Sequence, residues 1–159
     1  MGDKLVVEPA SVPDHPGSTS VARGEASDRL IFPNVDSCLA IVFIMADDAV
    51  IGAHVGQYGG QGFSVHDPDG NATAMVKDMK MLTDGKKILQ VFTLGDGFFN
   101  RRNILADVKI DPVIVYSRVS VDITVDPKLR VITVVANKKK DDKKAEWRFA
   151  ELRPGIINI

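Results

Sequence analysis

The order of hydrophobic and polar positions predicts a series of strands that begins near Arg29, with a turn at Pro33-Asn34. Ser37 to Met45 reads SCLAIVFIM, an apolar run with β-branched and aromatic residues on both faces, which is typical of a strand buried inside a packed sheet. Ala46-Asp47-Asp48 supplies turn chemistry, and residues 49–55 read AVIGAHV, a second strand. These two strands therefore form a predicted hairpin.

Beyond the hairpin, the pattern predicts an amphipathic helix, further strands and a second, short helix. Met75, Met79 and Leu82 recur at i, i+4 and i+7, with Asn71 as the cap and Gly85 after the last turn. Strands are predicted at 88–94, 112–116, 121–125 and 131–135 and around Trp147. The short helix is predicted to begin from Asn100 or Asn103, and Lys138–Lys144 is predicted to be a solvated loop. This order predicts an α+β fold with mixed, mainly antiparallel sheets and two helices.

The first 28 residues are predicted to be a disordered tail, and residues 29–159 a single α+β domain. Residues 8–28 are rich in Pro, Ser, Gly and Ala and have too few large apolar groups to offset the entropy of ordering. A length of 159 residues fits one domain. A tail of this composition also resembles the leaders of some exported bacterial effectors, so both the bacterial cytoplasm and a host cell stay open as locations.

Charge and composition exclude several classes of protein. The 20 Lys and Arg nearly cancel the 21 Asp and Glu, so no global field attracts nucleic acid or an anionic membrane. The longest apolar run, Leu39 to Met45, is far shorter than the roughly 20 residues that span a bilayer. A single cysteine, Cys38, excludes an intrachain disulfide and a four-thiolate metal site. We therefore expect no nucleic-acid partner and no membrane insertion.

Cys38 and His54 are the candidate nucleophile and base. Successive strand residues point to opposite faces, so with Asp47 at the centre of the turn these two side chains fall on one face, directly opposed or as diagonal neighbours. A directly opposed pair has Cβ atoms about 5 Å apart, which lets a thiol and an imidazole interact. The alternative is that Cys38 is a small buried hydrophobe, as free cysteines often are. His66 and His15 are weaker candidates, because they lie in the predicted loop and tail.

Between the hairpin and the helix, residues 56–71 read GQYGGQGFSVHDPDGN and predict a long surface loop. Gln57, Tyr58 and Gln61 are candidate substrate-binding residues, because loops at strand ends often carry binding groups. The alternative is that the loop is only a connection. It is not a phosphate-binding loop, because it lacks the Gly-Lys-Ser/Thr ending.

Three segments resemble the bacterial chemotaxis receptor glutamine deamidases (CheD) and, more remotely, the catalytic domains of the cytotoxic necrotizing factor toxins. Ser37-Cys38 before an apolar strand resembles the family's Gly-Ser-Cys segment, and Ile51–His54 resembles the segment that carries its catalytic histidine. LQVFTLGDGFF followed by residues 101–104, RRNI, is similar to the family's strand, glycine turn and helix start. With the hairpin at Asp126-Pro127, the resemblance covers roughly residues 37–136.

Two departures from the family pattern leave the third member of the site open. Phe32 stands six residues before the cysteine, where the family usually has a threonine that helps to position the histidine. Val35-Asp36 replaces the usual glycines before Ser-Cys. Asn34, Asp36 and Ser37 are the nearby polar alternatives, and Ser37 is counted among the candidate catalytic residues.

The resemblance implies a protein glutamine or asparagine deamidase that acts on a chemotaxis receptor-like or host GTPase-like protein. Cys38 would attack the carboxamide, backbone amides near it would stabilise the oxyanion, His54 would protonate the departing ammonia, and water would release the acid. No metal or organic cofactor is required. Two other classes stay open: a catalytically inactive CheD-like binding module, and an effector that uses the thiol as a protease or acyltransferase.

Overall fold

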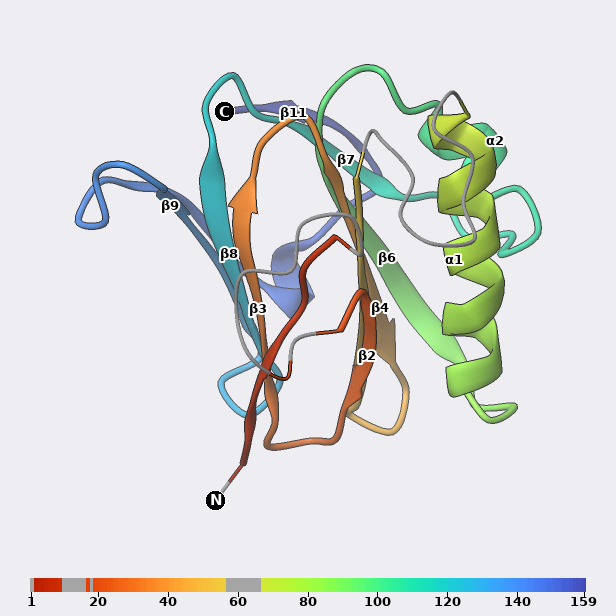
Figure 1. The fold of residues 1–159 in the computed structure, drawn as a ribbon. Helices are drawn as coiled ribbons and strands as arrows, with labels where there is room; N and C mark the ends of the chain where they lie inside the picture. The colour runs from red at the N-terminus through yellow and green to blue at the C-terminus, as the bar shows by residue number, and fades with distance from the viewer. Residues whose placement is uncertain (1, 10–16, 18, 57–66) are drawn as a thin grey trace.

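The computed structural model describes residues 2–9, 17, 19–56 and 67–159, which form two facing β-sheets with helices against the outer side of one of them (Figure 1). The five-stranded sheet contains, in spatial order, β1 (Lys4–Val6), β3 (Arg29–Val35), β8 (Val121–Asp126), β9 (Val131–Ala136) and β10 (Lys143–Arg148). The six-stranded sheet contains, in spatial order, β11 (Gly155–Asn158), β7 (Val113–Tyr116), β6 (Ile88–Gly95), β4 (Leu39–Met45), β5 (Val50–Val55) and β2 (Val21–Gly24). The helices are α1 (Pro68–Leu82), α2 (Arg101–Ile104) and the short 3₁₀ turn η1 (Phe149–Glu151).

Most of the strand pairs are antiparallel. The parallel pairs are β1 with β3, β6 with β7, and β7 with β11. The prediction of an α+β fold with mixed, mainly antiparallel sheets and two α-helices is therefore confirmed. The CheD-like arrangement of these elements stays a prediction.

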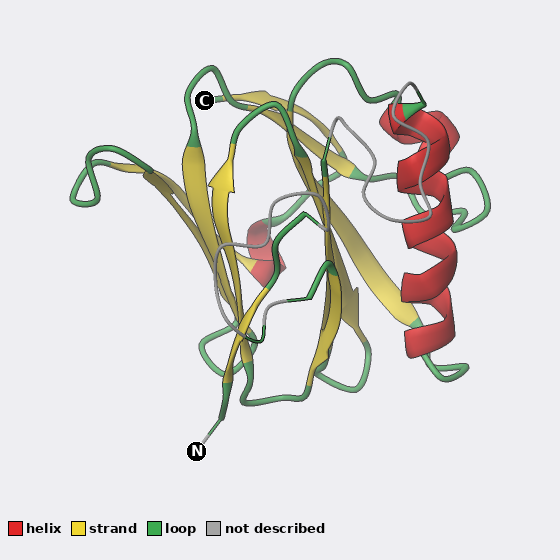
Figure 2. Cartoon of the chain, viewed as in Figure 1, coloured by secondary structure: helices red, strands yellow, loops and turns green. Residues whose placement is uncertain are grey.

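β4 is the central strand and is buried on both faces, which explains its uninterrupted apolar sequence. Its even-numbered side chains, Ala40, Val42 and Ile44, pack between the two sheets. Its odd-numbered side chains, Leu39, Ile41, Phe43 and Met45, pack in a second core with the buried residues of α1. The layers therefore run sheet, sheet, helix, as Figure 2 shows with α1 and α2 in red on one side.

The helix α1 begins earlier than the pattern predicts. The carboxylate of Asp67 accepts a hydrogen bond from the Gly70 amide at 2.9 Å, and Pro68 occupies the first helical position. Proline suits that position because its φ angle is already helical and it needs no hydrogen-bond partner there. The predicted cap, Asn71, is instead a buried residue inside the first turn.

The N-terminal segment is not a disordered tail where the structure describes it. Lys4–Val6 pairs in parallel with β3, and Val21–Gly24 pairs antiparallel with β5. The Val7 amide donates to the Ile31 carbonyl at 2.8 Å, and the Val7 side chain is fully buried. These short strands gain their hydrogen bonds from partners distant in sequence, which composition cannot reveal. Within the predicted tail, residues 1, 10–16 and 18 lie outside the described residues.

Other boundaries differ in smaller ways. β3 continues through Pro33-Asn34, predicted as a turn, because a bulge in its pairing with β8 accommodates the proline. α2 begins at Arg101 and is capped by Asn100, not Asn103. Lys143, predicted to lie in a loop, begins β10, and β11 is absent from the sequence-based prediction.

Gly52 gives a direct test of the close contact between the two sheets. An added Cβ would lie 2.5 Å from Phe32 Cζ and 2.9 Å from Leu30 Cδ1, both in the opposing sheet. Gly52→Ala is therefore expected to lower the free energy of unfolding by about 1–3 kcal/mol, the usual cost of overpacking a core. Gly97→Ala is the matched control, because its Cβ would meet only Tyr116 Cε1, at 3.9 Å. Equal urea midpoints for the two variants would contradict the packing described.

Candidate functional site

The pairing register of β4 and β5 brings Cys38 and His54 to the same face of the hairpin. Ala40 pairs with His54, and Leu39 pairs with Val55, so the hairpin is centred on Asp47. Cys38 lies two residues before Ala40 and is therefore the diagonal neighbour of His54. Its side chain packs against the core between the two sheets, as the parity of the strand requires. The predicted register is confirmed, with the pair diagonal and not directly opposed.

His54 is completely buried, and its ring is held by the backbone of the N-terminal segment. Its Nδ1 lies 2.9 Å from the carbonyl oxygen of Val7. A carbonyl only accepts hydrogen bonds, so this contact assigns the proton to Nδ1 and leaves Nε2 as an unprotonated acceptor. Nε2 has no hydrogen-bond partner among the described residues. The Phe32 ring packs nearby, with its centroid 6.1 Å from that of His54.

Burial decides the charge of this histidine. It lowers the pKa of His54 from the ordinary 6.5 to about 4, because an imidazolium loses its hydration inside the core. The hydrogen bond to Val7 and the charge of Glu8 act in the opposite direction without offsetting burial. The imidazole is therefore neutral at pH 7, which is the form that can accept a proton.

The group that holds the His54 ring is a backbone carbonyl and not one of the side chains predicted for the third position. The Val7 carbonyl is fixed because the Val7 amide bonds to Ile31 and the Glu8 amide bonds to Thr19. The His54 amide also donates to the Ser20 carbonyl at 3.0 Å, so the N-terminal segment holds both ring and backbone. A backbone acceptor carries no sequence signature, and this one lies within the first 28 residues, which were predicted to be a tail.

The predicted alternatives for the third position lie elsewhere. Asn34 accepts a hydrogen bond from the Ser120 hydroxyl at 2.7 Å, and Asp36 is exposed. Ser37 is exposed and has a left-handed φ of 53°. Within the described part of the chain, no hydrogen bond joins any of these side chains to His54. Ser37 therefore lies beside the candidate nucleophile without contacting the candidate base.

Cys38 is half-buried and lines a small pocket of about 70 Å³, which we call the Cys38 pocket. Besides Cys38, its main residues are Asp36, Ser37, Gly95, Asp96, Arg118 and Val119. The Cys38 carbonyl accepts a hydrogen bond from the Asp96 amide at 3.2 Å. Gly95 permits this close approach, because a Cβ there would overlap the same carbonyl oxygen. The glycine that ends β6 therefore fixes the backbone that carries the thiol.

Arg101 is a second buried polar residue at this end of the six-stranded sheet, and its burial was not predicted. Its guanidinium lies 4.5 Å from the ring centroid of Tyr116, and Nη2 donates to the Val115 carbonyl at 3.3 Å. Burial lowers the pKa of Arg101, while Tyr116 and Asp96 oppose this effect. Tyr116 pairs with Gly95, which pairs with Leu39 on its other side, so Arg101 supports the strands that end near Cys38.

The remaining candidates lie outside the described residues. They are the substrate-binding candidates Gln57, Tyr58 and Gln61 and the alternative histidines His66 and His15. Among the described residues, no group of three His, Cys, Asp or Glu side chains is arranged to hold a metal ion. None of the helices in the described part is long and apolar enough to cross a membrane.

Two comparisons with known proteins found no match. No protein-family model matches the chain, and no curated protein matches it. What the site can do chemically therefore rests on its own residues: a thiol, a neutral imidazole whose Nε2 has no partner among the described residues, and a fixed carbonyl that holds that imidazole.

Proposed function

We propose that the chain is a cysteine-dependent protein deamidase in which Cys38 is the nucleophile and His54 the base. The observation that carries the proposal is the state of His54, whose Nδ1 is anchored on Val7 while its buried Nε2 faces no partner in the described structure. A buried polar atom without a hydrogen bond costs about 1–3 kcal/mol, so such an atom calls for an explanation. A base that receives the proton of a neighbouring thiol supplies one.

The reaction follows from thiol chemistry. Nε2 takes the proton of Cys38, and the thiolate attacks the carboxamide carbon of a glutamine or asparagine to form a tetrahedral intermediate. The thiolate and imidazolium stabilise each other as opposite charges, which offsets the effect of burial on the histidine. The protonated Nε2 gives its proton to the leaving nitrogen, ammonia departs, and a thioester remains. Water, deprotonated by Nε2, then cleaves the thioester to a carboxylate.

Two observations favour a side-chain amide as the substrate. The resemblance of Ser37-Cys38 and Ile51–His54 to the CheD segments implies deamidation. The small volume of the Cys38 pocket, about 70 Å³, suits the end of a side chain better than a length of main chain. The target, receptor-like or GTPase-like, determines whether the protein acts in the bacterial cytoplasm or in a host cell.

A non-catalytic binding module is the second candidate. It is favoured by the complete burial of His54 and by Phe32, which stands where the family has threonine and packs beside the imidazole. In that case Cys38 and His54 are core residues of a deamidase-like scaffold. The two candidates differ in the reactivity of the thiol, because a structural cysteine is inert and an activated one is not.

The test is the pH dependence of iodoacetamide labelling at Cys38 in the folded protein. Wild type is expected to label rapidly at pH 7, below the ordinary thiol pKa of about 8.5, because the neutral Nε2 accepts the thiol proton as the sulfur attacks. His54→Asn is expected to slow labelling at pH 7 by about tenfold or more, because an ordinary thiol is only a few per cent thiolate there. Asparagine is the matched replacement, since its amide nitrogen can still donate to the Val7 carbonyl while the acceptor at Nε2 is lost.

Labelling that requires denaturant, or that is equal in both proteins, would favour the binding module. If labelling behaves as expected, cell extracts treated with wild type or with Cys38→Ser are compared by mass spectrometry. Amide-to-acid conversions that depend on Cys38 identify a deamidase, whereas chain cleavage identifies a protease.

A further inference from the structure

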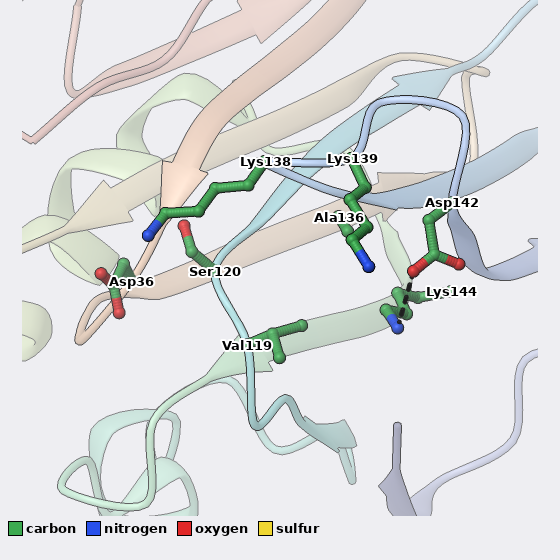
Figure 3. Close-up of a pocket in the computed structure, with 8 residues that line it drawn as sticks. All are labelled: Asp36, Val119, Ser120, Ala136, Lys138, Lys139, Asp142 and Lys144. Atoms are coloured by element: carbon green, nitrogen blue, oxygen red, sulfur yellow. Dashed lines mark ion pairs between the residues drawn. The ribbon is translucent and has the colours of Figure 1, made fainter.

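A larger pocket opens beside the Cys38 pocket. It has a volume of about 400 Å³ and lies between the turn after β3, the turn before β8 and the loop that joins β9 to β10 (Figure 3). We call it the lysine pocket, after Lys138, Lys139 and Lys144 in its lining. Asp36 and Val119 line both pockets, so the lysine pocket is adjacent to the Cys38 pocket.

The lining holds three lysines and two carboxylates, Asp36 and Asp142, so its cations outnumber its anions. Lys144 pairs with Asp142 at 3.0 Å. No ion pair joins Lys138 or Lys139 to a carboxylate within the described residues. Figure 3 shows the Lys138 side chain extending across the pocket toward Ser120. Arg118, in the lining of the Cys38 pocket, adds a further cation.

The loop that carries these lysines is held in place, although its sequence, KKKDDKK, predicts a solvated segment. The Asn137 amide donates to the Ser120 carbonyl at 2.9 Å, and its side chain donates to Asp122 at 2.8 Å. Asp122 also pairs with Lys140. The Asp142 amide donates to the Lys139 carbonyl at 2.8 Å, which closes the turn. A loop anchored in this way loses less entropy on binding than a free one.

The lysine pocket also offers an apolar contact. The Val119 side chain is 47% exposed at the junction of the two pockets, and Ala136 lines the floor. An apolar surface bordered by unpaired ammonium groups is complementary to a peptide segment with an apolar side chain next to a carboxylate. The net charge of the whole chain is only -1, so this preference is local to the pocket.

We propose that the lysine pocket binds an acidic segment of the protein substrate and so directs the target amide to Cys38. This inference rests on the function proposed for Cys38 and His54, and it names their substrate class: glutamine or asparagine with Asp or Glu nearby in the same chain. Lys138, Lys139 and Arg118 attract such a segment and repel a basic one, and repulsion of wrong partners contributes as much to specificity as attraction.

The experiment measures binding with the full-length Cys38→Ala protein, so that no thiol chemistry is involved. Two fluorescein-labelled peptides share a central glutamine and an adjacent leucine and differ only in flanking residues, Glu in one and Lys in the other. By fluorescence anisotropy at low salt, the Glu peptide is expected to bind about tenfold more tightly or better, because exposed charge pairs each change affinity by a few fold.

Charge-reversal variants test whether the preference for the Glu peptide arises in the lysine pocket. The double substitution Lys138→Glu with Lys139→Glu is expected to reduce the preference to less than about threefold. The matched control is Lys86→Glu with Lys87→Glu, an exposed pair that follows α1 and precedes β6, near the β4–β5 turn and so at the opposite end of β4 from Cys38. It changes the net charge equally and is expected to keep the preference. The neutral pair Lys138→Gln with Lys139→Gln serves if charge reversal disturbs folding.

Equal binding of the two peptides, no binding of either, or an equal loss in the test and control variants overturns the proposal. Failure of the deamidase proposal is a different result, because it appears as an inert Cys38 in the labelling experiment. A protein with an inert thiol that still prefers the Glu peptide would be an acidic-segment binding module.

Discussion

Deletion of residues 2–9 is expected to lower the free energy of unfolding by at least about 3 kcal/mol, even though these residues belong to the predicted tail. The buried Val7 side chain contributes about 1.5–3 kcal/mol, and each backbone hydrogen bond from this segment to β3 adds about 0.5–1.5 kcal/mol. Urea unfolding measures the loss. Trp147 packs at 5.5 Å from the Phe92 ring in the core and serves as the fluorescent reporter.

Val7→Ala separates the two roles of this segment. It removes core contacts, at a cost of about 2 kcal/mol, but it keeps the carbonyl that holds His54. Labelling of Cys38 at neutral pH is therefore expected to stay near the wild-type rate in Val7→Ala and to fall in the deletion. A deletion variant with the wild-type urea midpoint would show that the segment does not pack as described.

A loss of stability of up to about 3 kcal/mol is expected from His54 alone as the pH falls from about 6.5 to 4. The folded pKa of His54, about 4, lies below the ordinary 6.5 of the unfolded chain. In this window the unfolded state binds more protons than the folded state, so lowering the pH favours unfolding. Above about pH 6.5 the imidazole is neutral in both states, and the contribution is constant.

Carboxylates titrate in the same range, so the experiment compares wild type with His54→Asn at each pH. The shared carboxylates cancel in the difference between the two free energies of unfolding, and His54 remains. That difference is expected to change by up to about 3 kcal/mol in favour of the variant as the pH falls. A difference that stays constant from pH 7 to 4 would mean that the imidazole is not buried as a neutral group.

The central hairpin was predictable because the apolar run of β4 and the turn that follows it indicate the same structure. The apolar run of β4 requires burial on both faces, and the Ala46-Asp47-Asp48 turn sets the register that makes Cys38 and His54 neighbours. Both signals are local in the sequence. The fold class follows from a series of such local patterns.

The N-terminal strands and the Val7 carbonyl were not predictable in the same way. β1 and β2 have three and four residues and depend on partners supplied by β3 and β5. A backbone acceptor is available at every residue, so only the three-dimensional arrangement can single one out. The start of α1 was missed for a different reason, because Asp67-Pro68-Asp69-Gly70 suits both a turn and a capped helix.

The hydrogen bond between Val7 and His54 joins residues 47 apart in the chain, whereas Cys38 and His54 belong to a single hairpin. Hairpins close short loops, and contacts between distant residues form only after a larger loss of chain entropy has been offset. The thiol and the imidazole are therefore expected to become neighbours before the tautomer of the imidazole is fixed. If His54 activates Cys38 as proposed, labelling at pH 7 that is faster than in the unfolded chain marks completed folding. The time at which this faster labelling appears can be compared with the time at which Trp147 becomes buried.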